Sequence, residues 1–123
     1  MKYYKFLHKG TYCTLHMKTE LPPPGDPSPP IPNIQPSGSS GAGSGIGYHA
    51  YTKDILPYVA GDDYNKADLW IVQTHGHTIS YHLAHDKLAS VLPPHPMKCV
   101  VAESIELIEK VPFIVKDGRL YLL

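Results

Sequence analysis

Apolar and polar positions alternate through much of the chain, and this two-residue period predicts strands rather than helices. Aromatic and basic residues alternate in the first strand, whereas a continuous apolar run around Trp70 predicts a buried strand. The dipeptide His75-Gly76 separates that buried strand from the next one. The segments that carry the pattern are 3–8, 11–19, 68–73, 77–82 and 98–110.

Turn and cap signals complete the predicted fold. Asp117-Gly118 lies between two apolar runs, 113–115 and 120–122, which predicts a C-terminal hairpin. Thr52 is a candidate N-cap for a short helix that ends by Gly61, and apolar residues recur at helical spacing between 83 and 92. The predicted fold class is therefore α+β: a small, mainly antiparallel sheet with one or two short helices and a C-terminal β-hairpin.

A long arm interrupts this pattern at 22–45. Its first part is rich in proline and resembles a polyproline segment, and its second part, 37–45, consists mainly of glycine and serine. Neither part is suited to a packed core. The chain is accordingly predicted to be a single domain, 1–123, interrupted by an arm that contacts a neighbouring chain or folds back across its own domain.

Composition narrows the function classes. The 123 residues carry 11 basic and 11 acidic side chains, so the formal charge is zero, and no basic cluster indicates nucleic acid. Two cysteines suggest neither a disulfide framework nor a thiolate zinc site. No apolar run reaches the length of a membrane span. These features predict a soluble cytoplasmic protein without nucleic-acid or membrane partners.

Four histidines form a candidate metal site: His75, His77, His82 and His85. The first two share a face if their segment is a strand, and the last two are neighbours if theirs is a helix. Neutral imidazoles bind zinc, but the chain has no HExxH pattern and no paired cysteines. A solvated, histidine-rich loop explains the same residues, and both interpretations stay open, with no metal as the preferred one.

A second group of candidates surrounds Tyr48. A strand ending at His8 and a later Gly-Tyr-His segment resemble the ADP-ribosyltransferase fold. The resemblance implies that His8 holds the ribose of NAD, that Tyr48 stacks on nicotinamide, and that a late glutamate stabilises the reaction centre. Lys98 occupies the aligned position of that glutamate, and Glu103 is the nearest acid. The catalytic set under this alternative is His8, Tyr48, His49 and Glu103, with NAD as cofactor.

A broader resemblance covers most of 47–110. The chain is similar to small uncharacterised phage and bacterial proteins that carry a Gly-aromatic-His motif, a Leu-Pro-aromatic segment and two characteristic strands. The matching segments are Gly47-Tyr48-His49, Leu56-Pro57-Tyr58, Leu69-Trp70-Ile71-Val72 and 98–108. This resemblance implies a phage-associated protein, located in the host cytoplasm or in the virion.

No nucleophile stands beside a convincing base in the sequence, so a binding or assembly protein without enzymatic activity and without a cofactor is the preferred prediction. Its partner is a protein or a second copy of the chain, contacted through 22–45 and a tyrosine-rich surface. The candidate binding residues are Tyr48, His49, Tyr51, Tyr58, Trp70, Pro29, Pro30 and Ile31.

Overall fold

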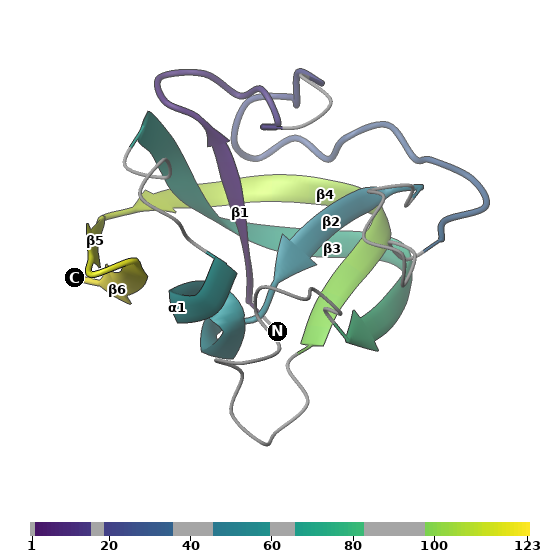
Figure 1. Cartoon of the computed structure of the whole chain (residues 1–123). Helices are drawn as coiled ribbons and strands as arrows, with labels where there is room; N and C mark the ends of the chain where they lie inside the picture. Colours follow the sequence, from purple (N-terminus) through teal and green to yellow (C-terminus); the bar gives the residue numbers. More distant parts are fainter. Residues whose placement is uncertain (1, 16–18, 36–45, 60–65, 83–97) are drawn as a thin grey trace.

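The computed structural model describes residues 2–15, 19–35, 46–59, 66–82 and 98–123 (Figure 1). Four antiparallel strands close into a small barrel in the order β1-β2-β4-β3. A separate two-stranded hairpin follows at the C-terminus. The strands are β1 Tyr3–His8, β2 Tyr48–Tyr51, β3 Ala67–His82, β4 Lys98–Val111, β5 Phe113–Lys116 and β6 Arg119–Leu122. Within the described ranges, no helix has the length and apolar character needed to span a membrane.

Apolar side chains fill both faces of the sheet, which explains the continuous apolar run in β3. Trp70 and Val72 join an arm-side core that also contains Leu21, the residue immediately before the arm. Leu69 and Ile71 point the other way, into a hairpin-side core. Members of the arm-side core also include Leu7, Tyr48, Ala50, Val100, Ala102, Ile105 and Leu107. Members of the hairpin-side core also include Tyr4, Phe6, Leu56, Ala67 and Leu120.

A β-bulge joins the two strands that the sequence predicted separately. β3 continues through Gly76, which adopts a φ of 79°, and the register to β4 shifts between His75 and Thr78. Glycine suits this conformation because it has no Cβ to clash. The bulge also changes which positions of β4 face the arm. Val100 lies before the bulge and Ile105 after it, and both side chains belong to the arm-side core, although residues at this spacing face opposite sides of a regular strand.

The described part of the arm continues the pairing of β4 where β2 ends. β2 pairs with 99–102, and the arm then donates backbone N–H groups to alternate carbonyls of β4 (Figure 1). The bonds run from Gly25 to Leu107, from Ser28 to Ile105 and from Ile31 to Glu103, at 3.0, 2.8 and 2.8 Å. Alternate carbonyls of a strand point to the same edge, so the arm lies along one side of β4.

The C-terminal hairpin lies where the Asp-Gly signal predicts it. Asp117 and Gly118 have φ of 54° and 74°, the two positive values of a type I′ turn, and Lys116 pairs with Arg119. Its inner face, including the buried Leu120, joins the hairpin-side core beside Leu56.

The predicted α+β class is wrong, because most of the described residues lie in antiparallel strands and the longest helix among them, α1, has four residues. The expected helix after Thr52 is a 3₁₀ turn, Lys53–Ile55, followed by α1, Leu56–Val59, and Thr52 makes no side-chain cap bond. Pro57 is tolerated in a first helical turn but cannot donate a backbone hydrogen bond. The predicted helical segment between 83 and 92 lies outside the described residues.

Two strand predictions also need correction. The second strand expected at 11–19 is reduced to two isolated bridges, Leu7–Thr14 and Cys13–Glu20, with 16–18 outside the described residues. Conversely, the sequence pattern predicts no strand at 48–51, where the structure has β2. Four residues that alternate buried and half-buried positions are enough for a strand when β4 supplies a complete partner.

Candidate functional site

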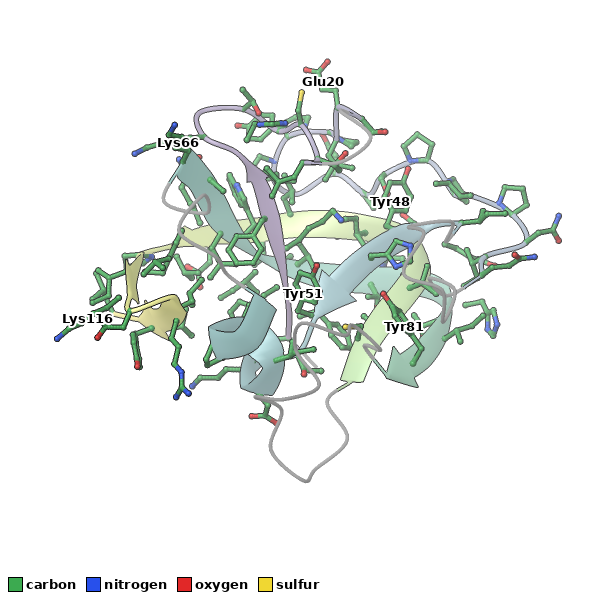
Figure 2. The ribbon with its side chains drawn as sticks, viewed as in Figure 1. Glu20, Tyr48, Tyr51, Lys66, Tyr81 and Lys116 are labelled. Carbon is green, nitrogen blue, oxygen red and sulfur yellow. The ribbon has the colours of Figure 1, made fainter. Side chains whose placement is uncertain are left out.

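Tyr48 ties the sheet to the proline-rich arm. Its side chain belongs to the arm-side core, and its hydroxyl donates to the carbonyl of Pro29 at 2.9 Å (Figure 2). Ile31 packs against the same core, whereas Pro29 and Pro30 are exposed. The structure therefore brings together four of the predicted binding residues, but it gives Tyr48 a structural role in holding the arm.

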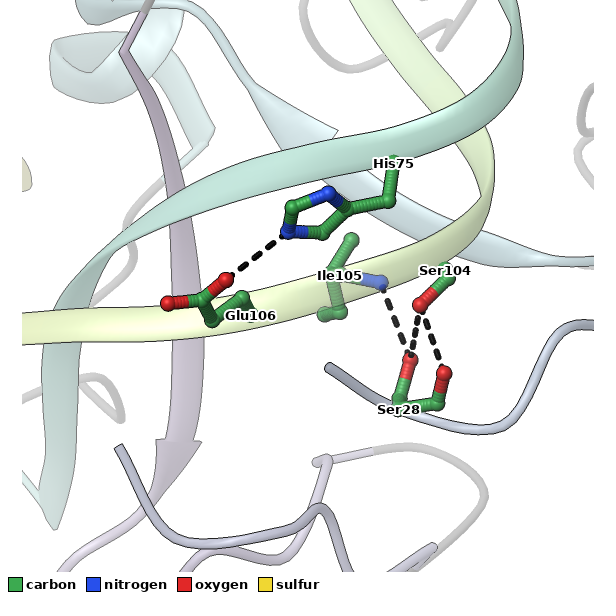
Figure 3. A network of polar contacts seen from close by, with 5 residues as sticks. All are labelled: Ser28, His75, Ser104, Ile105 and Glu106. Carbon is green, nitrogen blue, oxygen red and sulfur yellow. Dashed lines mark hydrogen bonds and ion pairs between the residues drawn. The ribbon is translucent and has the colours of Figure 1, made fainter. Parts of the chain in front are cut away.

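Ser28 is the anchor of this arm (Figure 3). Its backbone N–H donates to the Ile105 carbonyl, and its hydroxyl accepts from the Ile105 N–H at 2.9 Å. The Ser104 hydroxyl donates to the Ser28 carbonyl at 2.6 Å. All three residues are buried, so each polar group meets a partner that replaces water. Ser28 thus pairs with β4 as a strand residue would, although its neighbours are prolines.

Burial along the arm repeats every three residues. Ser28 and Ile34 are buried and Ile31 is half-buried. The intervening prolines are exposed: Pro27, Pro29, Pro30 and Pro32. A polyproline II helix has three residues per turn, so one residue in three can face the sheet while the others face outward. Each proline also fixes its own φ and favours an extended conformation in the residue before it. We call 27–32 the proline ridge.

His49 belongs to a different contact, on the opposite face of β2 from Tyr48. Its Nδ1 lies 2.9 Å from the Tyr81 hydroxyl, and the two rings meet edge to face at 5.8 Å. Tyr81 in turn hydrogen-bonds the thiol of Cys99, which is fully buried. Burial raises the pKa of this thiol to about 12, although the Tyr81 bond opposes the shift. A protonated, enclosed thiol cannot serve as a nucleophile at neutral pH.

The residues of the transferase alternative lie apart. His8 pairs with Ala67 of the hairpin-side core, whereas Tyr48 points into the arm-side core. Glu103 is half-buried, close to the backbone of Gly76, and Glu106 pairs with His75. The described residues therefore do not place His8, Tyr48 and an acid around one pocket, and the Tyr48 hydroxyl already has an acceptor in the arm.

The four candidate metal ligands do not form a described site. His75 Nε2 lies 2.8 Å from Glu106 Oε1 (Figure 3). His77 is exposed, one residue beyond Gly76. The backbone of His82 ends β3, and His85 lies outside the described residues. Among the described residues, no group of three histidine, cysteine or acidic side chains is arranged to hold a metal ion.

The remaining predicted binding residues contribute mainly to packing. Trp70 is 6% exposed in the arm-side core. Tyr51 packs against the hairpin-side core beside Phe6, with ring centroids 6.3 Å apart (Figure 2). The side chain of Tyr58 lies outside the described residues.

Sequence reasoning missed Lys5. This lysine pairs with Trp70 on the arm-side face, and its Nζ donates to the His49 carbonyl at 2.6 Å. Burial lowers the pKa of Lys5 from its usual 10.5 to about 8. The alternation of 3–8 could have placed Lys5 on an inward position, but its acceptor comes from β2, which the sequence did not reveal as a strand.

Comparison of the chain with protein families, curated proteins and solved structures found no match.

Proposed function

We propose that this chain is a binding protein without enzymatic activity, and that it contacts a protein partner through the proline ridge. The observation that carries the proposal is the three-residue period of burial along the arm. Ser28 and Ile31 are hydrogen-bonded to β4, and the prolines between and beside them are exposed: Pro27, Pro29, Pro30 and Pro32.

A fixed ridge lowers the entropy lost on binding. A free proline-rich segment is already stiff, and three backbone bonds to β4 restrict this one further. Protein domains that bind polyproline segments present grooves lined by aromatic side chains, into which proline rings pack. A partner with such a groove fits the exposed rings of the ridge.

The chemistry of the other candidate groups favours binding over catalysis. Cys99 is enclosed and protonated, and the Tyr48 hydroxyl and the His75 imidazole are engaged in the contacts that hold the arm and β4. The resemblance of 47–110 to phage and bacterial proteins suggests the setting. We propose a virion component or an accessory protein that acts in the host cytoplasm.

Site-specific photo-crosslinking in the producing cells tests this proposal. A photo-reactive amino acid is introduced at Pro32, on the ridge, and in a separate variant at Tyr121, which is exposed on the hairpin. We expect one discrete crosslinked partner from the ridge position, strongly reduced in the double variant Pro27→Ala/Pro30→Ala. Pro24→Ala changes an exposed proline outside the ridge and should leave the crosslink intact.

Two outcomes would contradict the role of the ridge. The first is equal crosslinking of the same partner from the hairpin position. The second is a ridge crosslink that survives the double alanine variant while circular dichroism shows an unchanged fold.

A further inference from the structure

A hollow of about 500 Å³ lies beside the turn that follows β1. Tyr12 and Trp70 supply aromatic wall, and Asp68, Lys110 and Glu20 supply charge. A smaller hollow of about 410 Å³ adjoins it, and the two share Asp68 and Lys110. These dimensions fall in the range of small-molecule sites.

Lys110 has unused hydrogen-bonding capacity at this hollow. Its ammonium lies 5.7 Å from the centre of the Trp70 ring, within the range of a cation–π contact. Its Nζ lies 3.5 Å from Asp68 Oδ2, longer than the 2.7–2.9 Å typical of a charge-assisted hydrogen bond. The side chain is 53% exposed. Lys110 is thus held in place while its donors remain open to a ligand.

The Trp70 indole adds a second unused donor. Its Nε1 is buried and has no hydrogen-bond partner among the residues that the structure describes, which is unfavourable for a buried donor. Because this nitrogen has almost no exposed surface, an acceptor reaches it only when a neighbouring side chain shifts. Tyr12, half-buried and packed edge-on against the indole at 5.8 Å, is the neighbour that can turn aside.

The two acidic side chains of the hollow lie away from the Lys110 donors or are already hydrogen-bonded. Asp68 is nearly buried, and its Oδ2 already accepts the Gly10 N–H at 2.8 Å. Glu20 is exposed at the rim, and Lys9 faces the adjoining hollow. A ligand oxyanion next to Lys110 would therefore meet the Lys110 ammonium, while Asp68 Oδ2 stays bonded to the Gly10 N–H and Glu20 stays at the rim.

We propose that this hollow binds a small organic oxyanion, a carboxylate or a phosphate monoester, whose flat apolar body packs between Tyr12 and Trp70. The Lys110 ammonium holds the anionic oxygen, and the indole N–H donates to the same anionic group as a second contact when Tyr12 moves. This site is independent of the proline ridge and goes beyond the proposed protein contact.

The test uses Trp70 as its own reporter, since it is the only tryptophan of the chain. Phenyl phosphate and benzoate are titrated into the full chain, with benzyl alcohol as the neutral analogue. Tryptophan fluorescence gives the affinity, and the single indole N–H resonance in a ¹⁵N-resolved NMR spectrum reports hydrogen bonding. The two anions distinguish a phosphate ester from a carboxylate as the preferred group.

We expect saturable binding of at least one anion with a dissociation constant of about 1 mM or below, and a downfield shift of the indole signal. Lys110→Met should weaken it about tenfold or more, whereas Lys116→Met, an exposed lysine of the hairpin, should not. No saturable change with either anion overturns the site. So does equal binding of benzyl alcohol, or unchanged binding by a folded Lys110→Met variant.

Discussion

Replacing Lys5 by methionine tests how the barrel closes between β1 and β2. Only one pair of residues, Tyr4 and Tyr51, is in register between these strands, so most of the β1–β2 contact lacks the regular backbone hydrogen bonds of a sheet. The Lys5 amine occupies this gap and donates to the His49 carbonyl at 2.6 Å. Its pKa falls from 10.5 to about 8 because burial disfavours the charged form.

The direction of the pH effect follows from proton counting. Below pH 8 the lysine is protonated in both states, and burial of its charge opposes folding. Between pH 8 and 10.5 the folded chain has released the proton and the unfolded chain still holds it, so stability rises with pH. The full shift corresponds to about 3 kcal/mol. Because the side chain keeps some exposure, we expect about 1–2 kcal/mol.

Urea denaturation of wild type and Lys5→Met across this pH range measures the effect. The two proteins differ only at position 5, so the difference in their unfolding free energies isolates Lys5. It should move by about 1–2 kcal/mol in favour of wild type between pH 8 and 10.5. Lys116→Met, an exposed control, should give a flat difference. A flat difference for Lys5→Met as well would refute the inferred burial of the amine.

Three further experiments test other parts of the fold. Gly47→Ala should destabilise the chain by about 2–4 kcal/mol in thermal melts, because Gly47 has a φ of 121° and an added methyl carbon would lie 2.6 Å from a side-chain carbon of β4. Gly10→Ala, with a positive φ but open space, should cost only about 1 kcal/mol; equal losses would contradict the close approach. Ser28→Ala removes the hydroxyl contact to β4 and should cost about 1–2 kcal/mol, with faster hydrogen exchange in the arm; unchanged exchange would show that the anchor lies elsewhere. A thiol reagent at neutral pH should modify the half-exposed Cys13 and spare Cys99 until the chain unfolds, and mass spectrometry of the native protein would reveal any early reaction at Cys99.

Local patterns predicted several strands of the sheet and the C-terminal turn. The alternation in 3–8, the apolar run around Trp70 and the Asp117-Gly118 turn each correspond to a strand or turn of the structure. In these segments, neighbouring residues alone decide the conformation, since strand alternation and positive-φ turns are local properties.

The errors arose where tertiary pairing decided the outcome. Thr52 carries a cap signal, yet Pro57 and the packing of Leu56 allow only a short turn and α1. β2 has four residues and exists because β4 offers it a partner. The same holds for the site: proline spacing suggested a stiff arm, but the hydrogen bonds that Ser28 accepts from β4, and that orient the ridge, join residues far apart in sequence.

The placement of the arm also affects whether the sheet can associate edge to edge with another sheet. Beyond β2, the side of β4 at 103–107 would be an open edge, which is the usual starting point of edge-to-edge aggregation. Ser28 and Ile31 satisfy that edge, and the prolines around them have no N–H to offer a further strand. The ridge therefore terminates sheet growth on this side. A chain that loses 24–34 would expose an aggregation-prone strand, so the segment that carries the proposed partner contact would also protect the sheet from aggregation.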